Sequence, residues 1–273
     1  MNLALAEDLD AAGDITTDAI FPAAATVHAA IRSRQPGRIA GVDCIAITLS
    51  KFPEPARVAV VAGDGTDVAP GDTVARLSGA ARTVLSSERT ILNLLCRLSG
   101  IATATAAAVR QVSGHRAVIK DTRKTTPGLR ALEKYAVAVG GGVNHRFGLH
   151  DAVLIKDNHI ALAGSITAAI ERVQSRRGPS MPVQVEVDSL DQLEEALGCQ
   201  VDAVLLDNLP TDWLCQAVKL VDGRCLTEAS GGVSLANVRE VAATGVDAIS
   251  LGWLTHSAPA LDLGLDFVAP REA

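Results

Sequence analysis

Aromatic residues are scarce in this chain of 273 residues, at 3% of the sequence, although hydrophobic residues make up 48%. A buried core must therefore consist mainly of alanine, valine, leucine and isoleucine, which favours close packing of helices on strands. Charged residues make up 21%, a balance that is typical of a globular protein and argues against a disordered or fibrous one. The length allows one large domain or two modest ones.

Three further absences narrow the class of protein. No uninterrupted run of about 18 apolar residues is present, so we expect no membrane span. The N-terminal segment is acidic from Glu7 onward and has no basic region, which argues against a secretory signal. The five cysteines include no CxxC pair and are odd in number, so we expect reduced thiols in a cytoplasmic protein and no zinc site.

Lysine is also missing between Phe52 and Ile119. The segment 57–77 lies in this stretch and has hairpin-like turns at GDG and PGD, a pattern similar to that of biotinyl and lipoyl carrier domains. Because those carriers attach their group to a lysine, a structural role is favoured here. The alternating segment 25–33 predicts a strand.

The net charge of −6 argues against general nucleic-acid binding, but the charge is unevenly distributed. Residues 115–156 contain eight lysines and arginines and three acids, so this basic segment carries about +5 and the remainder about −11. A local basic segment in an acidic protein predicts a site for a small polyanion, with a solvated basic face as the alternative.

Residues 86–112 are expected to form a helix. Ser86 or Ser87 before Glu88 resembles a capping box, and leucine or isoleucine then recurs at helical spacing. Gly100 is a possible break in this helix.

Short apolar runs recur beyond residue 117, and each ends in polar residues. They lie at 117–122, 152–158, 183–189, 203–208, 225–232 and 248–253. Such runs suit buried parallel strands, and the helical stretches between them indicate βα units that can close into a barrel. Active sites of such barrels lie at the carboxyl ends of the strands. The polar residues at those ends are Asp121, Lys156, Asp157, Glu186, Asp207 and Glu228.

Two loops in the basic segment are candidates for anion binding. DTRKTTPGLR places Arg123 and Lys124 directly after an expected strand. GGGVNHRFG combines three glycines, which let the backbone approach a ligand, with His145 and Arg146. Taken alone, either loop could be ordinary exposed surface.

Two further groups of residues are candidates for binding a metal ion and a phosphate. Glu186 and Asp207 end adjacent expected strands, and their hard oxygens suit Mg2+ carried in on a pyrophosphate, with ion-pair partners of the basic segment as the alternative. ASGGVS, residues 229–234, is expected to open a helix whose free N–H groups bind phosphate. GWLTHS, residues 252–257, follows the next strand and would complete a phosphate site made by two late loops.

The segment 121–159 closely resembles the core of the quinolinate phosphoribosyltransferases. Further matches cover nearly the whole chain in order, at 7–20, 86–105, 185–190, 205–208, 228–232 and 251–257. The resemblance implies an α/β fold with an N-terminal α/β sandwich-like domain and a C-terminal irregular, open α/β barrel. The expected domains are 1–100 and 101–273, and residues from about 258 can pack back on the first domain.

The same resemblance implies a reaction. Phosphoribosyl pyrophosphate (PRPP) would transfer its sugar phosphate to quinolinate with decarboxylation, giving nicotinate mononucleotide, CO2 and pyrophosphate for NAD biosynthesis. Mg2+ is the expected cofactor. A homodimer with composite active sites, possibly extended to a higher oligomer, is the expected assembly, and no nucleic-acid or membrane partner is expected.

Roles for individual residues follow from the resemblance. The residues implied to bind quinolinate are Arg123, His145, Arg146 and Lys156, together with Arg89 from the partner subunit. Those implied to bind PRPP are Lys124, Asp157, Ser230, Gly231, Gly232 and Gly252. Glu186 and Asp207 are implied to hold the metal and, with Lys124, to be catalytic.

Two alternatives stay open. One is a homologue of the same fold with another acceptor, such as the molybdenum-transport-associated type; the intact segments IKDNH and VNHR argue against it. The other is a non-catalytic sensor of a phosphate ligand, which the full set of cations argues against.

Overall fold

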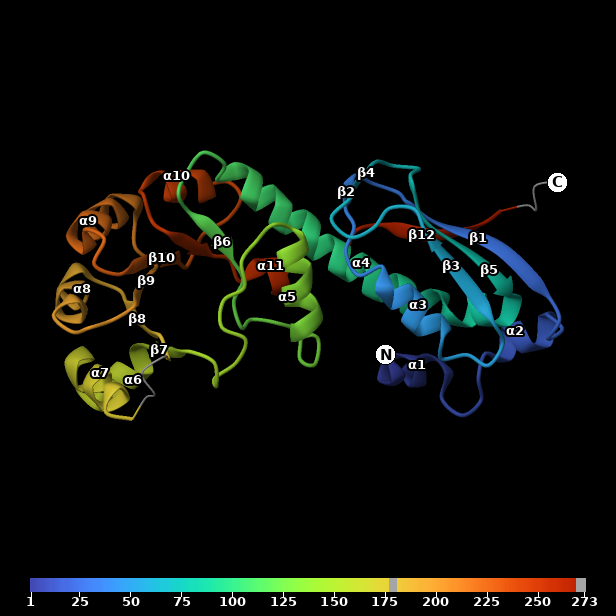
Figure 1. The fold of residues 1–273 in the computed structure, drawn as a ribbon, viewed down its shortest axis with the longest axis horizontal. Coiled ribbons are helices and arrows are strands. Elements are labelled where there is room, and N and C mark those ends of the chain that lie inside the picture. Colours follow the sequence, from blue (N-terminus) through green and yellow to red (C-terminus); the bar gives the residue numbers. More distant parts are fainter. Residues whose placement is uncertain (177–180, 269–273) are drawn as a thin grey trace. The chain divides into compact units, whose positions relative to one another are not determined.

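The computed structural model describes residues 1–176 and 181–268. The chain divides into two compact units. The first unit comprises residues 1–104 and the segment from Ala258 onward, and the second comprises Thr105–Ser257. Helix α4 (Ala81–Gln111) begins in the first unit and ends in the second (Figure 1).

The first unit contains an antiparallel sheet with the strand order β12-β1-β5-β3, and a small ladder of β2 and β4. Its elements besides α4 are α1 (Asn2–Leu9), α2 (Ile15–Ile20), β1 (Thr26–Ser33), β2 (Gly37–Arg38), α3 (Asp43–Leu49), β3 (Ala56–Val60), β4 (Asp67–Val68), β5 (Thr73–Ala80) and β12 (Leu263–Phe267). Strand β1 confirms the strand predicted at 25–33. The core of this unit is aliphatic, as the composition indicates, and includes Ile31, Ile45 and Leu95.

Helix α4 begins at Ala81, five residues before the predicted start, so the predicted capping box is wrong. Ser86 and Ser87 lie inside the helix: the Ser86 hydroxyl donates to Asp14 Oδ2 at 3.0 Å, and the Ser87 hydroxyl donates back to the Val84 carbonyl at 3.2 Å. Serine in a helix interior commonly bonds the preceding turn in this way. Gly100 does not end the helix.

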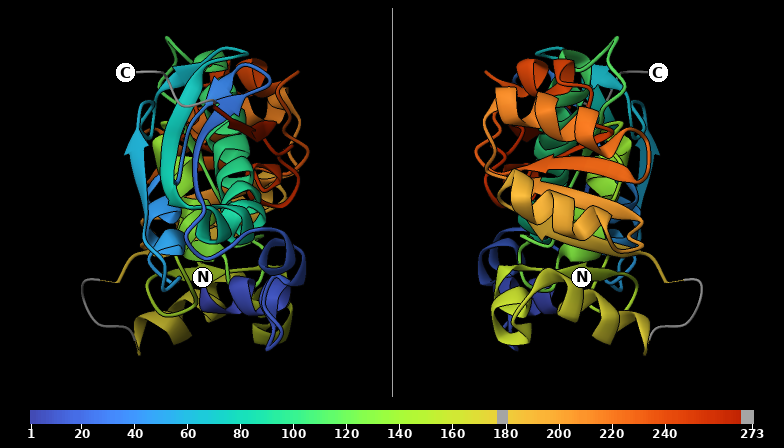
Figure 2. Two further views of the ribbon diagram at one scale, coloured as in Figure 1. Left: turned by 90° about the vertical axis from the view of Figure 1, so that its right-hand side faces the viewer. Right: turned by 90° about the vertical axis from the view of Figure 1, so that its left-hand side faces the viewer.

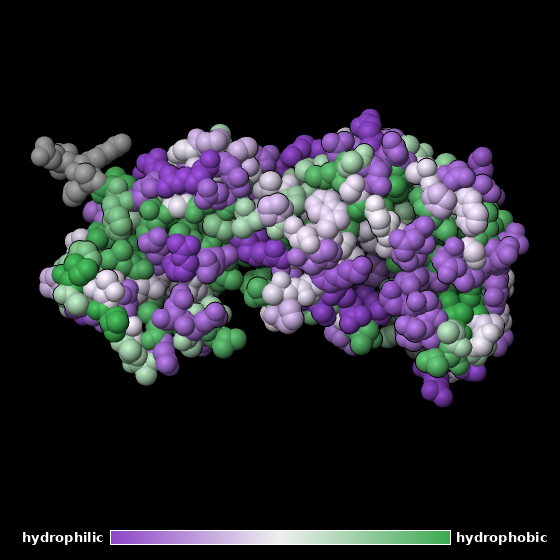
Figure 3. Space-filling view, turned by 180° about the vertical axis from the view of Figure 1, so that it is seen from behind, coloured by the Kyte–Doolittle hydropathy of each residue, from purple (hydrophilic) through white to green (hydrophobic). Residues whose placement is uncertain are grey.

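Helix α4 is long enough and apolar enough to cross a membrane: the mean hydropathy of its most apolar stretch of 18 residues is 1.4. The stretch contains polar residues, so it is not an uninterrupted apolar run. In the structure 61% of this stretch is buried within the protein. Core helices pass the same test of length and composition, so this is weak support for a membrane span. On the face shown in Figure 3, hydrophilic and hydrophobic residues are interspersed.

The second unit is built on a six-stranded parallel sheet with the order β6-β11-β10-β9-β8-β7. All six predicted strands are confirmed: β6 (Val118–Lys120), β7 (Val153–Ile155), β8 (Val183–Val187), β9 (Ala203–Asp207), β10 (Leu226–Ser230) and β11 (Ala248–Ser250). Strands β6 and β7 are the two ends of this order, so the barrel is open, and beyond β6 an isolated bridge joins Lys120 to Val143.

Helices connect the strands and cover the outside of the sheet, as α8 and α9 do in the right-hand view of Figure 2. They are α5 (Arg130–Val139), α6 (Asp157–Ala163), α7 (Ile166–Gln174), α8 (Leu190–Leu197), α9 (Thr211–Val221), α10 (Val238–Ala243) and α11 (Trp253–His256). In β8 the valines are buried, whereas Gln184 and Glu186 are only half-buried. Since successive side chains point to opposite faces of a strand, the polar pair faces the barrel interior.

Candidate active site

A cavity of about 550 Å³ lies at the carboxyl ends of the parallel strands. Ten of the thirteen predicted site residues line it: Arg123, Lys124, His145, Arg146, Lys156, Glu186, Asp207, Ser230, Gly231 and Gly232. They come from six separate segments of the second unit. The parallel sheet brings them together because all its strands end at the same edge.

The other three predicted residues do not line this cavity. Arg89 is exposed on α4 in the first unit and lies in the interior of the helix, not at its N-terminus. Asp157 is exposed and accepts a bond from the Asn158 amide at 2.7 Å. Gly252 immediately precedes α11, where an added Cβ would lie 2.9 Å from Lys124 Cδ.

A buried carboxylate holds the two basic loops in place. Asp121 is fully buried, forms an ion pair with Lys134 of α5, and accepts the His145 amide at 2.8 Å. With its amide suitably oriented, Asn144 donates to Asp121 at 2.6 Å and to the Lys134 carbonyl at 2.9 Å. Burial raises the pKa of Asp121, and these bonds act in the opposite direction.

The glycine run after α5 allows the chain to return close to β6. An added Cβ at Gly142 would lie 2.8 Å from Val137 Cγ1 and 2.9 Å from Thr105 Cγ2. The next residue, Val143, donates to the Ile119 carbonyl at 2.8 Å. The glycines therefore permit the close approach that sets His145 and Arg146 beside the barrel strands.

Two guanidinium groups, those of Arg123 and Arg146, line the cavity. The Nε atom of Arg123 is buried and has no hydrogen-bond partner within the described chain. Burial and then the charge of Arg123 lower the pKa of Arg146, whose Nη1 donates to the Ala152 carbonyl at 3.0 Å. Like charges held together in a partly buried site favour the binding of an anion.

Lys156 and Glu186 contribute charges of opposite sign to the same cavity. Lys156 Nζ lies 2.5 Å from Glu186 Oε2, and the lysine side chain is 45% exposed. Asp207 Oδ2 accepts from the side-chain Nδ2 of Asn208 at 2.7 Å. The described residues contain no group of three or more His, Cys, Asp and Glu that could hold a metal. Glu186 and Asp207 would thus need oxygens from a ligand to complete the coordination of a metal ion.

His145 lines the cavity as a ring whose two nitrogens already have protein partners. Its Nδ1 accepts the Arg146 amide at 2.7 Å, and its Nε2 lies 3.1 Å from Gln184 Oε1. Burial lowers the pKa of His145, although Glu228 acts in the opposite direction. The imidazole is therefore neutral at physiological pH, and its role in holding a substrate stays a prediction.

The glycine loop after β10 differs from the expectation. Helix α10 begins only at Val238 and has six residues, so ASGGVS does not open the helix. Its first two residues end β10 and the rest lie in a loop. Gly231 has φ +89°, and an added Cβ would lie 2.2 Å from Asn208 Oδ1. Trp253 Nε1 donates to the Val233 carbonyl at 3.0 Å and thereby joins this loop to α11. Phosphate binding here would depend on loop N–H groups.

Five residues of the cavity were not predicted: Thr122, Leu154, Leu205, Asn208 and Ser250. Asn208 adopts φ +56°, a left-handed conformation that asparagine tolerates better than most residues. An asparagine directly after a strand was the one local signal that could have identified it. The others sit on strands and loops where only the fold shows which side chains face inward.

An open parallel α/β barrel with this cationic cavity at the carboxyl ends of its strands places the chain in the class of α/β-barrel enzymes. More specifically, the chain belongs to the quinolinate phosphoribosyl transferase family. The pattern of the family's C-terminal domain matches residues 101–266, and that of its N-terminal domain matches residues 14–99. The family, the α/β fold class and the enzyme class predicted from the sequence are confirmed.

Named relatives cover nearly the whole chain. It is 49% identical over 269 residues to the nicotinate-nucleotide pyrophosphorylase [carboxylating] of Mycobacterium leprae, an alignment that covers 96% of this chain and 94% of the relative. A probable enzyme of the same name from Bacillus subtilis is 43% identical over 261 residues, covering 96% and 90%. The crystal structure of nicotinate-nucleotide pyrophosphorylase from Ehrlichia chaffeensis matches with a TM-score of 0.94 at 41% identity, covering 98% and 97%.

Proposed function

We propose that this protein transfers the phosphoribosyl group of PRPP to quinolinate and releases CO2 and pyrophosphate, giving nicotinate mononucleotide for NAD biosynthesis. One observation carries the proposal: four cations, Arg123, Lys124, Arg146 and Lys156, line a single cavity of about 550 Å³. Quinolinate is a dianion and PRPP carries several more negative charges. The names of the family and of the relatives support the same reaction.

The arginines position the pyridine ring. The guanidinium groups of Arg123 and Arg146 each present parallel donors that match a carboxylate, and Arg123 Nε has no partner among the described residues. Holding the two carboxylates of quinolinate in this way aims the ring nitrogen at C1 of the ribose. After the nitrogen bonds to C1 it carries a positive charge, which stabilises the carbanion left when the adjacent carboxylate departs as CO2.

The acidic side of the cavity faces the sugar. Glu186 or Asp207 stabilises the oxocarbenium-like charge on the ribose as pyrophosphate leaves. Both carboxylates fit Mg2+ bound together with pyrophosphate oxygens, and the ion, when bound, neutralises the charge of the leaving group. Ser230 at the end of β10 and the loop residues Gly231 and Gly232 bind the 5′-phosphate through their N–H groups. Lys124 lies between the two substrates, and Asp157 and Gly252 lie beside PRPP.

Arg89 completes the proposal for the assembly. It lies in the first unit, exposed on α4, and we assign it to the quinolinate site of a partner subunit. The active form would then be a homodimer with two composite sites, in the cytoplasm.

The decisive experiment is an assay of the purified protein with quinolinate, PRPP and Mg2+, in which released CO2 and pyrophosphate are measured. Nicotinate is the control acceptor because it lacks the second carboxylate that the cation set accommodates. We expect quinolinate-dependent release of both products and poor turnover with nicotinate. Equal turnover of the two acceptors would contradict the proposal.

A further inference from the structure

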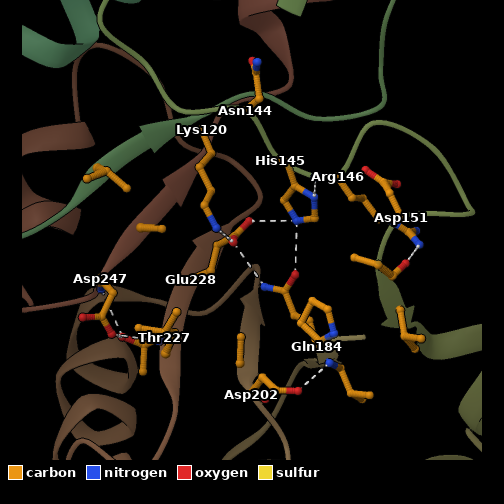
Figure 4. A pocket seen from close by; sticks show the side chains of 18 of the residues that line it. Lys120, Asn144, His145, Arg146, Asp151, Gln184, Asp202, Thr227, Glu228 and Asp247 are labelled. Carbon is orange, nitrogen blue, oxygen red and sulfur yellow. Dashed lines mark hydrogen bonds and ion pairs between the residues drawn. The ribbon is translucent and has the colours of Figure 1, made fainter. Parts of the chain in front are cut away.

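A second cavity, of about 620 Å³, lies at the opposite end of the barrel. The first residues of all six parallel strands line it, and its walls are mainly apolar. The polar side chains at its inner end, those of Lys120, Gln184, Glu228 and His145, bind one another (Figure 4). Its significance lies in the residues that it shares with the candidate active site, His145 and Arg146.

Glu228 of β10 is the centre of a polar cluster between the two cavities. The other members of the cluster are Lys120, Gln184, Ser250 and His145. It is 2% exposed and accepts from Lys120 Nζ at 2.8 Å, from Gln184 Nε2 at 3.2 Å, and from the Ser250 hydroxyl. Its Oε1 also lies 3.4 Å from His145 Nε2 (Figure 4). Four side chains thus direct donors at one carboxylate, and only an ionised acid can accept from all of them.

The hydrogen bonds around His145 define which nitrogen carries its proton. Nδ1 accepts the Arg146 amide, so it has no proton. Nε2 faces two oxygens, those of Gln184 and Glu228, and must donate. The amide oxygen of Gln184 can face His145 because the Gln184 nitrogen is directed to Glu228. The orientation of the ring therefore depends on Glu228 both directly and through Gln184.

We propose that Glu228 is a positioning residue for the quinolinate side of the active site, because it holds His145 in the Nε2–H form with its ring between the two cavities. The Arg146 backbone amide donates to His145 Nδ1, so a fixed ring orientation also holds the backbone of Arg146 in place. Arg146 is one of the two arginines that we propose to bind a carboxylate. Glu228 also neutralises Lys120, which would otherwise be an unpaired cation beneath the site. The proposal rests on the proposed function for its kinetic effect, but not for its effect on the histidine.

Glu228→Gln is the direct test, since it keeps the size of the side chain and replaces one acceptor oxygen with an NH2 group. That group must face either Lys120 and Gln184 or Ser250 and His145. The Ser250 hydroxyl can rotate to accept, but Lys120, the Gln184 NH2 group and His145 Nε2–H are donors, so either orientation leaves a donor without its acceptor. We expect the KM for quinolinate to rise by roughly 10-fold or more, the loss typical of a charge-assisted hydrogen bond, while the KM for PRPP changes less than about 2-fold.

The spectroscopic readout is the 15N–1H correlation spectrum of the histidine rings. In the wild type, His145 should give the pattern of a single Nε2–H form, assigned with a His145→Gln variant. In Glu228→Gln this pattern should be lost or averaged. Asp247→Asn is the matched control, because Asp247 lines the same cavity but bonds Thr227 and Arg116, so both KM values and the histidine pattern should be kept.

If Glu228→Gln does not fold by circular dichroism, Gln184→Met carries the test. It removes the oxygen that accepts from His145 and leaves Glu228 in place, so the same changes should appear at smaller size. An unchanged histidine pattern with both KM values altered equally would show a merely structural role and overturn the proposal. If the wild type does not turn over quinolinate at all, the proposed function fails, and the histidine pattern still decides the positioning role.

Discussion

At the scale of single residues, Arg146 and Arg116 provide a matched pair of cations from the same basic segment. Arg146 lines the candidate active site, whereas Arg116 is 69% exposed in its side chain and pairs with Asp247 at the other end of the barrel. Arg146→Ala should weaken quinolinate binding roughly 10- to 150-fold, the loss of about 1.5–3 kcal/mol expected for a charge-assisted bond. Arg116→Ala should leave it unchanged, and titration calorimetry measures both.

Lys156→Ala should also weaken quinolinate binding far more than PRPP binding. Arg123→Lys should not restore wild-type affinity, because a lysine lacks the planar pair of donors. Unchanged quinolinate affinity in the Arg146 and Lys156 variants would remove these residues from the site.

His145 should make the stability of the protein depend on pH. Burial lowers its pKa in the folded state, whereas in the unfolded chain the pKa returns to about 6.5. As the pH falls below about 6.5 the unfolded state binds a proton that the folded state does not, so stability is lost on acidification and retained above that pH. Urea unfolding at several pH values between about 5.5 and 7.5 should show this slope, and His145→Gln should reduce it.

The exposed His28→Gln variant is the control for that measurement. An identical slope in wild type and His145→Gln would contradict the assignment to His145.

Glu228 should cause a second loss of stability at lower pH. Burial alone would raise its pKa, but Lys120 and the other donors hold the pKa below its ordinary value, so its contribution disappears as the carboxylate becomes protonated.

At the scale of elements, Gly100 tests whether packing outweighs helix propensity in α4. Alanine in a helix interior is favoured over glycine by about 1 kcal/mol, so propensity alone predicts that Gly100→Ala stabilises the protein. The added Cβ would, however, lie 2.1 Å from the carbonyl oxygen of Pro259. We therefore expect a loss of about 1–3 kcal/mol in the free energy of unfolding, measured with urea.

Gly63→Ala, in a loop, is a control for a glycine-to-alanine change with no steric contact. No atom lies within 4 Å of a Cβ added there, and its φ is not in the left-handed region. We therefore expect Gly63→Ala to change the stability less than Gly100→Ala does. A stabilised Gly100→Ala would show that the backbone at Pro259 can shift at little cost.

At the scale of the whole molecule, the composite site predicts that two inactive variants can complement each other. Arg89→Ala and Lys124→Ala homodimers should each be nearly inactive. In a mixed dimer one site carries both substitutions and the other carries neither. If half of the dimers are mixed, activity should return to about one quarter of wild type, a statistical expectation of the symmetry.

Native mass spectrometry of the co-expressed variants confirms that mixed dimers are present. Absence of recovery in such a sample would place Arg89 in the site of its own subunit or outside any site.

The sequence by itself determined the six parallel strands and most of the site. Apolar runs that end in polar residues are local patterns, and parallel strands bring those ends to one edge wherever the barrel forms. Arg123, Lys156, Glu186 and Asp207 could therefore be grouped without a structure, and the glycine-rich loop indicated Arg146 separately. The family was also apparent from the sequence, because its segments occur in order along the chain.

Only the tertiary structure decided where helix α4 begins and which side chains hydrogen-bond to one another in the barrel. Helix α4 starts early because Ala81, Thr83 and Val84 are buried and the Ala81 amide bonds the Ala25 carbonyl at 2.8 Å, a contact between distant parts of the chain. The contacts of His145 Nε2 are likewise made with Glu228 of β10 and Gln184 of β8, whereas His145 itself lies in a loop. Such bonds join residues far apart in sequence, so no local pattern of hydrophobicity or charge can reveal them.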